Sequence, residues 1–479
     1  MKNRSLAISL SFAITLHSAL AAAIAQPPSK SPLFNADTVV QLEMAADFVK
    51  IRKAAPDGGF NLEDGELNDP QYYGAIALRD SSHPERAFTG QARGRGMSSL
   101  YFDESEFPKL KVEIQDSEDL KGTLFQGARN FRVNTHLFTN SEGEHTPMGR
   151  LIGDNGPMRE GLAYRLAEAL GLKTPATRLA RIRYTDYGTK TSFTRNALLV
   201  ETTKKIGERL GGTEVLEYEF AEMEKTGIDP VEGALYRLFH KIIGNADIQL
   251  RVNEAPFMTT ENRRAIFNAM VFEMPDKRRV PVIYDLDMSS FVTGYGEIKF
   301  TRKEFNLNTR EAALFVIGFG SLRQKFTKEQ LDKAIAIAKS KKDLLYQVVQ
   351  NTPVDKAGRE NAKLHLDTFF AYIDHAMSLP IIIQEGVQFY SDAQKKNAIL
   401  PLSPMSEEPG TLRPGTPVAI LGKEGKMLKV AILNINNDLP SYDKYIGYID
   451  ANTKIDTVLP SELVGRADER DMSFGAHGG

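Results

Sequence analysis

Two polar segments in the second half of the chain contain residue types that could handle a metal ion and a phosphate. The first is GNADIQLRVN, residues 244–253, in which Asp247 stands between asparagines. The second is YDLD, residues 284–287. Mg²⁺ takes oxygen ligands, commonly one or two carboxylates with an amide oxygen and substrate phosphates. Asp285 with Asn253 supplies such a set, and Asp247 beside it could accept a proton from an attacking hydroxyl.

The elements that flank these segments would bring them side by side. The stretch 230–244 carries apolar residues on one helical face and ends at the first segment. The stretches 264–274 and 278–287 predict a hairpin that turns around Pro275. A helix that ends in a polar loop, followed by a hairpin whose second strand ends in Asp285, places loop and strand end together.

The spacing of the first segment agrees loosely with protein kinases. Those enzymes place an Asp and a following Asn in one loop, then a metal-binding Asp after the next hairpin. Asn253 lies six positions after Asp247 (253 − 247), one more than the kinase pattern H-R-D-x-x-x-x-N. The alternative is that Asn and Asp only satisfy backbone groups at the end of the helix.

A phosphoryl-transfer site also needs a cation for the phosphates, usually a strand lysine held by a helix glutamate. Arg132 lies in a predicted strand, and Glu160 lies in a helix that Pro157 and Gly171 delimit. The dipole of that helix alone would also explain Glu160. Glu201 ends a strand that would lead to a nucleotide-binding hinge.

The Gly- and Arg-rich stretch RAFTGQARGRG, residues 86–96, has two interpretations. Backbone N–H groups and guanidinium groups could cradle an anion there. The same composition is also typical of a solvated turn.

Composition narrows the class of protein. The 479 residues favour two or three domains. Because 60 basic side chains are balanced by 62 acidic ones, we expect no nucleic-acid partner. Basic residues, an apolar run and small residues up to Ala25 predict a cleaved signal peptide, with an uncleaved anchor as the alternative. The absence of cysteine excludes disulfides and thiolate metal sites, and a periplasmic or secreted protein fits best.

Other chemistries find less support in the sequence. The histidines show no zinc-binding spacing, and neither G-x-S-x-G nor G-x-G-x-x-G occurs. Asp247 and Asp285 could act as the carboxylate pair of a glycosidase or bind Ca²⁺. Tryptophan, which often forms sugar platforms, is absent.

Four segments together resemble the CotH-type kinases, secreted or spore-coat relatives of the protein kinases. They are MREGLAYRLAEALGLKTPATRLARIRY, RNALLVE, GNADIQLRVN and VPVIYDLD, and the resemblance covers roughly residues 85–380. The segment that begins MREGLAY resembles the family's R-x-x-L-A-Y helix. GNADIQLRVN is also similar to the loop of HipA-type kinases.

The resemblance implies roles for individual residues. It makes Asp247 the catalytic base, Asn253 and Asp285 the metal ligands, and Asp287 a supporting carboxylate. Arg132 takes the place of the phosphate-holding strand lysine, with Glu160 as its partner. The sequence departs from the family at that lysine, in the length of the loop and at Gln249, where the family has histidine.

The tail changes character. Residues 411–458 resemble a bacterial SH3 module, a type that binds peptidoglycan or peptides in other exported proteins. The expected fold is α+β: a two-lobed protein-kinase-like fold followed by a small β-barrel. The expected parts are a signal peptide (1–25), a linker with first strands (26–85), a β-rich N-lobe (86–203), a mainly helical C-lobe (204–392), an SH3-like barrel (405–462) and a disordered tail (463–479).

The predicted function is that of an exported atypical kinase-like phosphotransferase. It would use ATP or another nucleotide with Mg²⁺ or Mn²⁺ to modify a protein or a small hydroxyl acceptor. The alternative is a catalytically inactive kinase fold that acts as a cell-envelope binding module through its SH3-like part.

Overall fold

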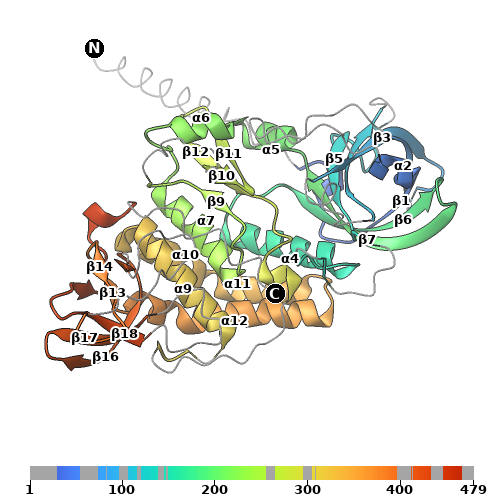
Figure 1. Ribbon diagram of the computed structural model, residues 1–479. Helices are drawn as coiled ribbons and strands as arrows, with labels where there is room; N and C mark the ends of the chain where they lie inside the picture. The colour runs from blue at the N-terminus through green and yellow to red at the C-terminus, as the bar shows by residue number, and fades with distance from the viewer. Residues whose placement is uncertain are drawn as a thin grey trace, which may run out of the picture.

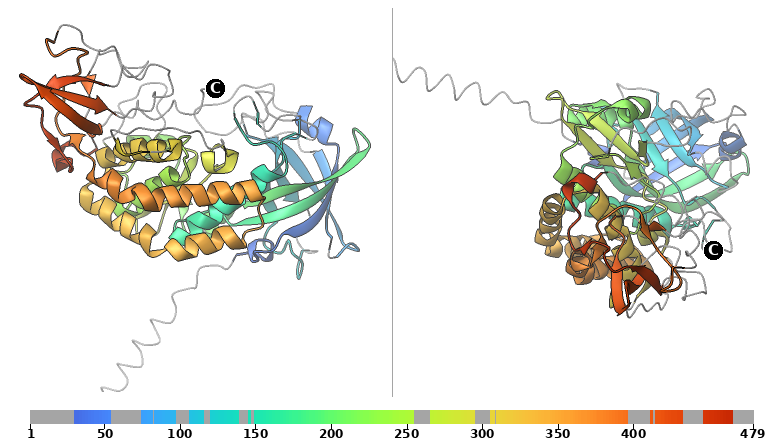
Figure 2. Two further views of the ribbon diagram at one scale, coloured as in Figure 1. Left: turned by 90° about the horizontal axis from the view of Figure 1, so that it is seen from below. Right: turned by 60° about the vertical axis from the view of Figure 1, so that its left-hand side comes forward.

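The protein is a mixed α/β structure in which a β-barrel, a helical part and a small β-rich part follow one another along the chain (Figure 1). The computed structural model describes residues 30–53, 74–81, 83–96, 106–115, 120–138, 145–146, 149–254, 265–294, 305–307, 309–395, 411–412, 414–432 and 446–465. The barrel and the β-rich part lie at opposite ends of the helical part (Figure 2).

Seven strands form a closed barrel in the order β1-β2-β3-β4-β5-β7-β6. All neighbours are antiparallel except β1 and β6, whose parallel pairing closes the barrel. The strands are β1 Val40–Ala46, β2 Gly74–Asp80, β3 Ala87–Arg95, β4 Lys109–Ile114, β5 Asn130–Asn134, β6 Thr177–Asp186 and β7 Thr191–Glu201, with η2 Pro32–Phe34 and α2 Phe48–Lys53 beside them.

Successive side chains of a strand point alternately into the filled interior of the barrel and to its outer face. In β4, Leu110, Val112 and Ile114 are buried in the barrel core. Lys109 and Lys111 must therefore lie on the outer face of the same strand. This outer face of β3, β4 and β5 turns out to border the candidate site.

The helical part carries its own, larger hydrophobic core, to which α4 also contributes. Local signals set its helix ends: the Asp229 carboxylate accepts from two backbone N–H groups at the start of α7, and Gly171 ends α4 with φ of 94°. The helices are α4 Asn155–Leu170, α5 Thr203–Leu210, α6 Glu217–Glu222, α7 Pro230–Ile242, α8 Ser290–Thr293, α9 Arg310–Lys325, α10 Lys328–Ser340, α11 Lys342–Asn351 and α12 Lys356–Ser378.

Short strands border the helical part. The predicted hairpin is confirmed, since β11 and β12 pair antiparallel and β8 extends them to three strands. A separate pair, β9 and β10, follows the first polar segment. The strands are β8 Thr213–Glu214, β9 Gln249–Leu250, β10 Ile266–Phe267, β11 Ala269–Glu273 and β12 Arg279–Ile283.

The C-terminal part is β-rich, but its described strands form three small sheets: β16-β17-β18, β13-β19 and β14-β15. The expected closed barrel is not confirmed there. The elements are β13 Ile381–Ile382, β14 Val387–Gln388, β15 Thr411–Leu412, β16 Val418–Glu424, β17 Met427–Ile432, β18 Ile446–Asp450, β19 Ile455–Asp456 and η6 Ser461–Leu463.

Some expectations need revision against these elements. The stretch 86–96 is mostly strand β3 and not a turn. The expected lobe boundary at residue 86 cuts the barrel, because β1 and β2 belong to the same closed sheet. The predicted signal peptide and most of the predicted disordered tail lie outside the described residues.

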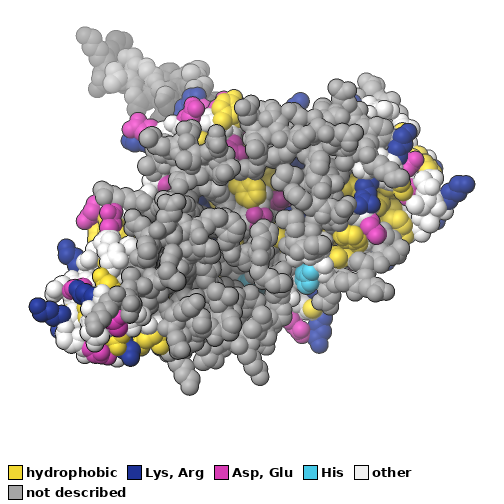
Figure 3. Space-filling model, viewed as in Figure 1, with side chains coloured by type: hydrophobic (Ala, Val, Ile, Leu, Met, Phe, Trp, Pro, Cys, Tyr) yellow, Lys and Arg dark blue, Asp and Glu magenta, His cyan; other side chains and the backbone are white. Residues whose placement is uncertain are grey.

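Among the side chains coloured in Figure 3, basic and acidic ones are interspersed at both ends of the molecule, and neither sign dominates. This agrees with a formal net charge of −2. Among the described helices, none combines the length and the apolar composition that a membrane span requires.

Candidate functional site

The acidic segment after β12 lies where the barrel meets the helical part. Asp285 adopts a left-handed backbone with φ of 54°, and its N–H donates to the Tyr164 hydroxyl at 3.0 Å. Left-handed non-glycine residues cost energy and persist where the surroundings hold them. The hairpin and α4 thus fix the direction in which the chain from Tyr284 to Asp287 leaves the strand.

Lys109 of β4 is the cation that meets this acidic segment. Its ammonium lies 2.8 Å from Asp287 Oδ2 and 3.3 Å from Asp285 Oδ1, and only 7% of the residue is exposed. Burial disfavours the charged form, but Asp285 and Asp287 outweigh burial and raise the pKa of Lys109. Lys109 is therefore charged at any physiological pH.

A second cation, Arg150, approaches the same carboxylate from the loop before α4. Its Nε donates to Asp287 Oδ2 at 3.0 Å, and both side chains are largely buried. Burial alone would raise the pKa of Asp287, but Lys109 and Arg150 outweigh burial and lower this pKa. Asp287 is thus a permanent anion held between two cations.

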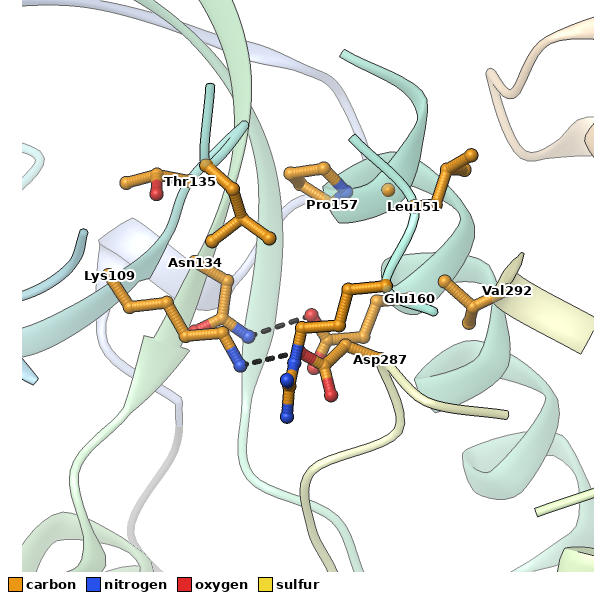
Figure 4. Close-up of a pocket in the computed structure, with 11 residues that line it drawn as sticks. Lys109, Asn134, Thr135, Leu151, Pro157, Glu160, Asp287 and Val292 are labelled. Carbon is orange, nitrogen blue, oxygen red and sulfur yellow. Dashed lines mark hydrogen bonds and ion pairs between the residues drawn. The ribbon is translucent and has the colours of Figure 1, made fainter. Parts of the chain in front are cut away.

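Glu160 of α4 faces this cluster across a small cavity (Figure 4). It accepts from Asn134 Nδ2 at 2.7 Å, and the side-chain oxygen Asn134 Oδ1 accepts from Arg95 Nη2. Burial raises the pKa of Glu160 to about 7; Lys109 lowers this pKa, whereas Asp287 adds to the rise. Asn134 thereby joins Arg95 of a strand to Glu160 of a helix, a glutamate whose pKa burial raises.

The outer face of β3, β4 and β5 carries basic residues opposite one another. Arg95 pairs with Lys109 across β3 and β4. In the next row, Arg93 pairs with Lys111, and Lys111 pairs with Arg132 of β5. Like charges directly opposite one another destabilise a sheet. We refer to these five residues as the basic face.

The acidic segment and the basic face are joined through Tyr284. Its hydroxyl accepts from Arg95 Nη1 at 3.1 Å, and the Arg132 guanidinium lies 5.2 Å from the centre of its ring. Burial raises the pKa of Tyr284, but Arg132 and Arg95 outweigh burial and leave this pKa below its ordinary value. The basic face is thus directed at the strand end that carries the aspartates.

Asp247 lies on the neighbouring loop between α7 and β9. Asn268 donates its amide to the Asp247 carboxylate at 2.8 Å and adopts a left-handed φ of 49°. Burial and the charges of Asp285 and Asp287 raise the pKa of Asp247 to about 6. A carboxylate with such a pKa is ionised at neutral pH and is a better proton acceptor than an ordinary aspartate.

The site leaves some buried polar atoms without a hydrogen-bond partner among the described residues: Glu160 Oε1, Asp287 Oδ1 and Arg132 Nη1. The cavity lined by Lys109, Glu160 and Asp287 measures about 20 Å³, room for one water molecule. In the described part of the chain, no group of three or more acidic, His or Cys side chains could hold a metal ion alone. Asp285 and Asp287 would therefore fit a divalent ion only together with phosphate oxygens, which Mg²⁺ commonly uses.

The predicted metal ligand Asn253 does not join the aspartates. Its amide donates to the Lys325 carbonyl oxygen at 2.9 Å and to Gln330 Oε1 at 3.1 Å. The amide beside Asp247 belongs to Asn268 instead. The Asn245 side chain accepts from the Asp247 N–H at 3.0 Å, which is a turn within the loop and not a cap on α7, since that helix ends at Ile242.

The predicted phosphate pair also differs from the structure. Arg132 donates to Thr203 Oγ1 at 2.6 Å and makes no ion pair with Glu160. Lys109, one strand away, is the cation that pairs with the aspartates, and it lines the same cavity as Glu160. Glu201 is buried, forms an ion pair with Arg209 at 2.8 Å and accepts from the Ala176 N–H at 2.9 Å. Its carboxylate therefore has a structural role in the fold.

Two functional candidates were thus missed by sequence reasoning, Lys109 and Asn268. The alternation in β4 shows that Lys109 faces away from the barrel core, although it does not show what that face meets. Asn268 interrupts the strand-like run RAIFNAMVFEM, residues 264–274, and a turn-forming residue inside such a run is a usable signal.

Helix α4, which carries Glu160, is held from the other side by the helical part. Arg159 forms a two-pronged pair with Asp355 at 2.9 and 2.6 Å and also donates to the Val292 carbonyl oxygen. Arg159 is 6% exposed. Glu160 therefore sits on a helix that is anchored to α8 and to the start of α12.

Replacing Asp355 by alanine should destabilise the protein by about 3 kcal/mol, because it leaves the Arg159 charge buried without its partner. The free energy of unfolding in urea measures this loss. Glu360→Ala, which removes an exposed pair with Lys356 at 3.7 Å, is the control and should change almost nothing. Equal effects of the two substitutions would show that α4 is not anchored through Arg159.

Comparison with known proteins adds little to this geometry. No family model matches the sequence, and no curated protein matches it. Part of this chain is weakly similar to the crystal structure of the Helicobacter pylori proinflammatory kinase CtkA, with 11% identity over 56% of this chain and 89% of that chain. The TM-score is 0.29, and a likeness at that level carries no argument. The role of the site has to be inferred from its own residues.

Proposed function

We propose that this chain is a kinase-like phosphotransferase that moves a phosphoryl group from a nucleotide to a hydroxyl acceptor. The observation that carries the proposal is the basic face of β3, β4 and β5 directed at the acidic segment after β12. Like charges directly opposite one another in neighbouring strands repel, and the pairing of Lys109 with Asp285 and Asp287 offsets part of that repulsion. Phosphate oxygens would reduce the repulsion further, and the adjoining aspartates suit the divalent ion that accompanies phosphates.

In this proposal the barrel with α4 and the helical part act as the two lobes of a kinase. Arg95, Lys109 and Arg132 would bind the donor phosphates, since planar guanidinium groups and an ammonium are the usual phosphate ligands. The partnerless Arg132 Nη1 is one such donor. Glu160 would position Arg95 through Asn134 and attract Lys109 across the cavity.

Asp247 would act as the general base. The acceptor hydroxyl loses its proton to the Asp247 carboxylate, its oxygen bonds to the transferred phosphorus, and the bond to the leaving nucleotide oxygen breaks. The pKa of about 6 keeps Asp247 ionised at neutral pH for this step. A divalent ion held by Asp285, Asp287 and phosphate oxygens would neutralise charge that develops on the transferred group.

The acceptor is a protein or a small hydroxyl compound, and the donor is ATP or another nucleotide with Mg²⁺ or Mn²⁺. The predicted signal peptide would place this chemistry in the periplasm or outside the cell.

A second candidate is a kinase fold that binds without turnover, as a cell-envelope module. It is favoured by the two cations that already pair with Asp287 Oδ2 and by the hydrogen bonds of Asn253 to Lys325 and Gln330. In that case Lys109 and Arg150 would occupy the place of the metal permanently. Peptidoglycan or a peptide bound by the C-terminal part would then be the relevant ligand.

Nucleotide-dependent stabilisation tests the proposal. We expect ATP with Mg²⁺ or Mn²⁺ to stabilise the full-length protein against thermal unfolding, by about 2.7 kcal/mol at a hundred times the dissociation constant. Asp287→Asn should lose the part of this shift that depends on the divalent ion. Asp276→Asn, in the exposed turn of the hairpin, should keep it.

The outcomes separate the two candidates. A shift that needs a divalent ion, together with transfer of radiolabelled phosphate to any acceptor, supports the phosphotransferase. If no nucleoside triphosphate stabilises the wild-type protein with either ion, the proposal is overturned in favour of binding without turnover.

A further inference from the structure

The C-terminal strands are packed onto the helical part and do not form a separate body. Ala431 of β17 is buried in the same core cluster as residues of α7, α9 and α12, and Ala419 and Ile446 pack against that cluster. The Val418 N–H donates to the Pro380 carbonyl oxygen at 2.9 Å, directly after α12. These strands therefore share a core with the helices that support the site.

The last turn of α9 holds this C-terminal part. Arg323, which is 4% exposed, donates to the carbonyl oxygens of Leu379 and Thr457. The neighbouring Gln324 donates from Nε2 to the Pro414 carbonyl oxygen at 2.7 Å. Two successive side chains of α9 are thus bound to backbone groups of the C-terminal part.

The next residue of the same turn reaches the loop that carries Asp247. Lys325 lies 2.6 Å from Glu254, and both side chains are 3% exposed. The other oxygen of Glu254 accepts from the Val252 N–H at 2.7 Å. The Lys325 carbonyl oxygen accepts from the Asn253 amide at 2.9 Å. We call residues 245–254, which run from Asn245 to Glu254, the base loop.

The chain after η6 touches the base loop directly. The Gly465 N–H donates to the Gln324 carbonyl oxygen at 2.8 Å. Gly465 has φ of 78°, and a Cβ atom there would lie 2.9 Å from the Asn253 carbonyl oxygen. Only glycine lets the chain approach the loop so closely.

We propose that the C-terminal part positions the base loop in two ways: directly through Gly465, and through the last turn of α9, where Lys325 binds Glu254. Asn253, which the sequence suggested as a metal ligand, instead fixes the C-terminal end of the base loop to Lys325. Lys325 is a positioning residue, because it acts on Asp247 through Glu254 and the loop backbone. The consequence for catalysis rests on the proposed phosphotransferase function, whereas the ordering of the loop does not.

A matched pair of glycine substitutions tests the contact. Gly465→Ala and Gly425→Ala both introduce a Cβ at a left-handed position, but nothing lies within 4 Å of a Cβ at Gly425. Amide hydrogen exchange of the full-length protein is measured without nucleotide. We expect exchange in the base loop to rise about tenfold in Gly465→Ala and to stay at the wild-type rate in Gly425→Ala. Equal rates in both variants would overturn the proposal.

Lys325 gives an independent test. Lys325→Met should increase exchange in the base loop more strongly than Gly465→Ala, since among the described residues Arg237, at 3.7 Å, is then the cation left to the buried Glu254. Lys325→Arg should restore the wild-type rate. If the chain transfers phosphate, Lys325→Met should lower kcat about tenfold or more with little change in KM. Wild-type exchange in Lys325→Met would overturn the proposal, whereas lack of activity in every variant bears only on the proposed function.

Discussion

Replacing Lys109 by methionine should destabilise the protein by about 3 kcal/mol and remove most of its affinity for nucleotide. In the wild type, the ammonium neutralises Asp285 and Asp287 in a largely buried setting. Without it, Asp287 keeps Arg150 alone. Urea unfolding measures the stability, and nucleotide-induced thermal shifts measure the binding.

The same variant reports on metal binding. Because a vacant place opens beside two carboxylates, Mg²⁺ should stabilise Lys109→Met more than it stabilises the wild type. Arg132→Met is the contrast, since Arg132 bonds to Thr203 and lies over Tyr284. Arg132→Met should weaken nucleotide binding but leave no buried carboxylate to attract Mg²⁺. Lys121→Met, at an exposed position, should change neither quantity.

The sign of the pH effect follows from Asp287. Its pKa lies below the ordinary value of an aspartate, so its ion pairs stabilise the fold above about pH 4 and lose that effect as the pH falls. The stability deficit of Lys109→Met should therefore be greatest near neutral pH and narrow in acid. A deficit that stays constant with pH would mean that Lys109 does not act through these carboxylates.

Replacing Asp247 by asparagine should lower the phosphoryl-transfer rate by about 10²- to 10⁴-fold. In the wild type the rate should fall as the pH drops through about 6, because protonated Asp247 no longer accepts a proton. The variant should lose this acidic limb of the profile. A rate close to that of the wild type would exclude Asp247 as the base.

Stability separates this loss of activity from unfolding. A carboxyl group whose folded pKa is raised stabilises the fold at low pH, and that contribution is lost as the pH rises through about 6. Asp247→Asn should therefore be at least as stable as the wild type at pH 7. Asn268→Gly gives the graded test: glycine tolerates the φ of 49°, and loss of the amide should move the acidic limb above pH 6.

The sequence predicts the elements of the site better than their contacts. Periodicity and end signals locate α4 and α7, and the hairpin of β11 and β12 follows from its turn. Glu160, Asp247 and the two aspartates are thereby placed on elements that do meet at the junction. Each of these signals depends only on residues that are close together in the sequence.

The failures concern side chains whose partners are distant in sequence. Arg132 and Lys109 lie on neighbouring strands and the same face, so only the placement of Asp285 and Asp287 decides which cation reaches the carboxylates. Similarly, Asn253 forms a hydrogen bond with Lys325, 72 residues later, whereas Asn268 forms one with Asp247. Spacing within one segment carries no information about either choice.

Closure of the barrel gives the first described strand an unusual place in the order of folding. β1 must pair with β6, which is synthesised after the other barrel strands except β7. A nascent chain therefore exposes β1 for as long as Thr177–Asp186 has not yet emerged from the ribosome, and such long-range pairing is slow. Until that moment the strand is an open edge that other chains can extend, so chaperone protection of residues 40–46 during synthesis would matter more than that of any helix.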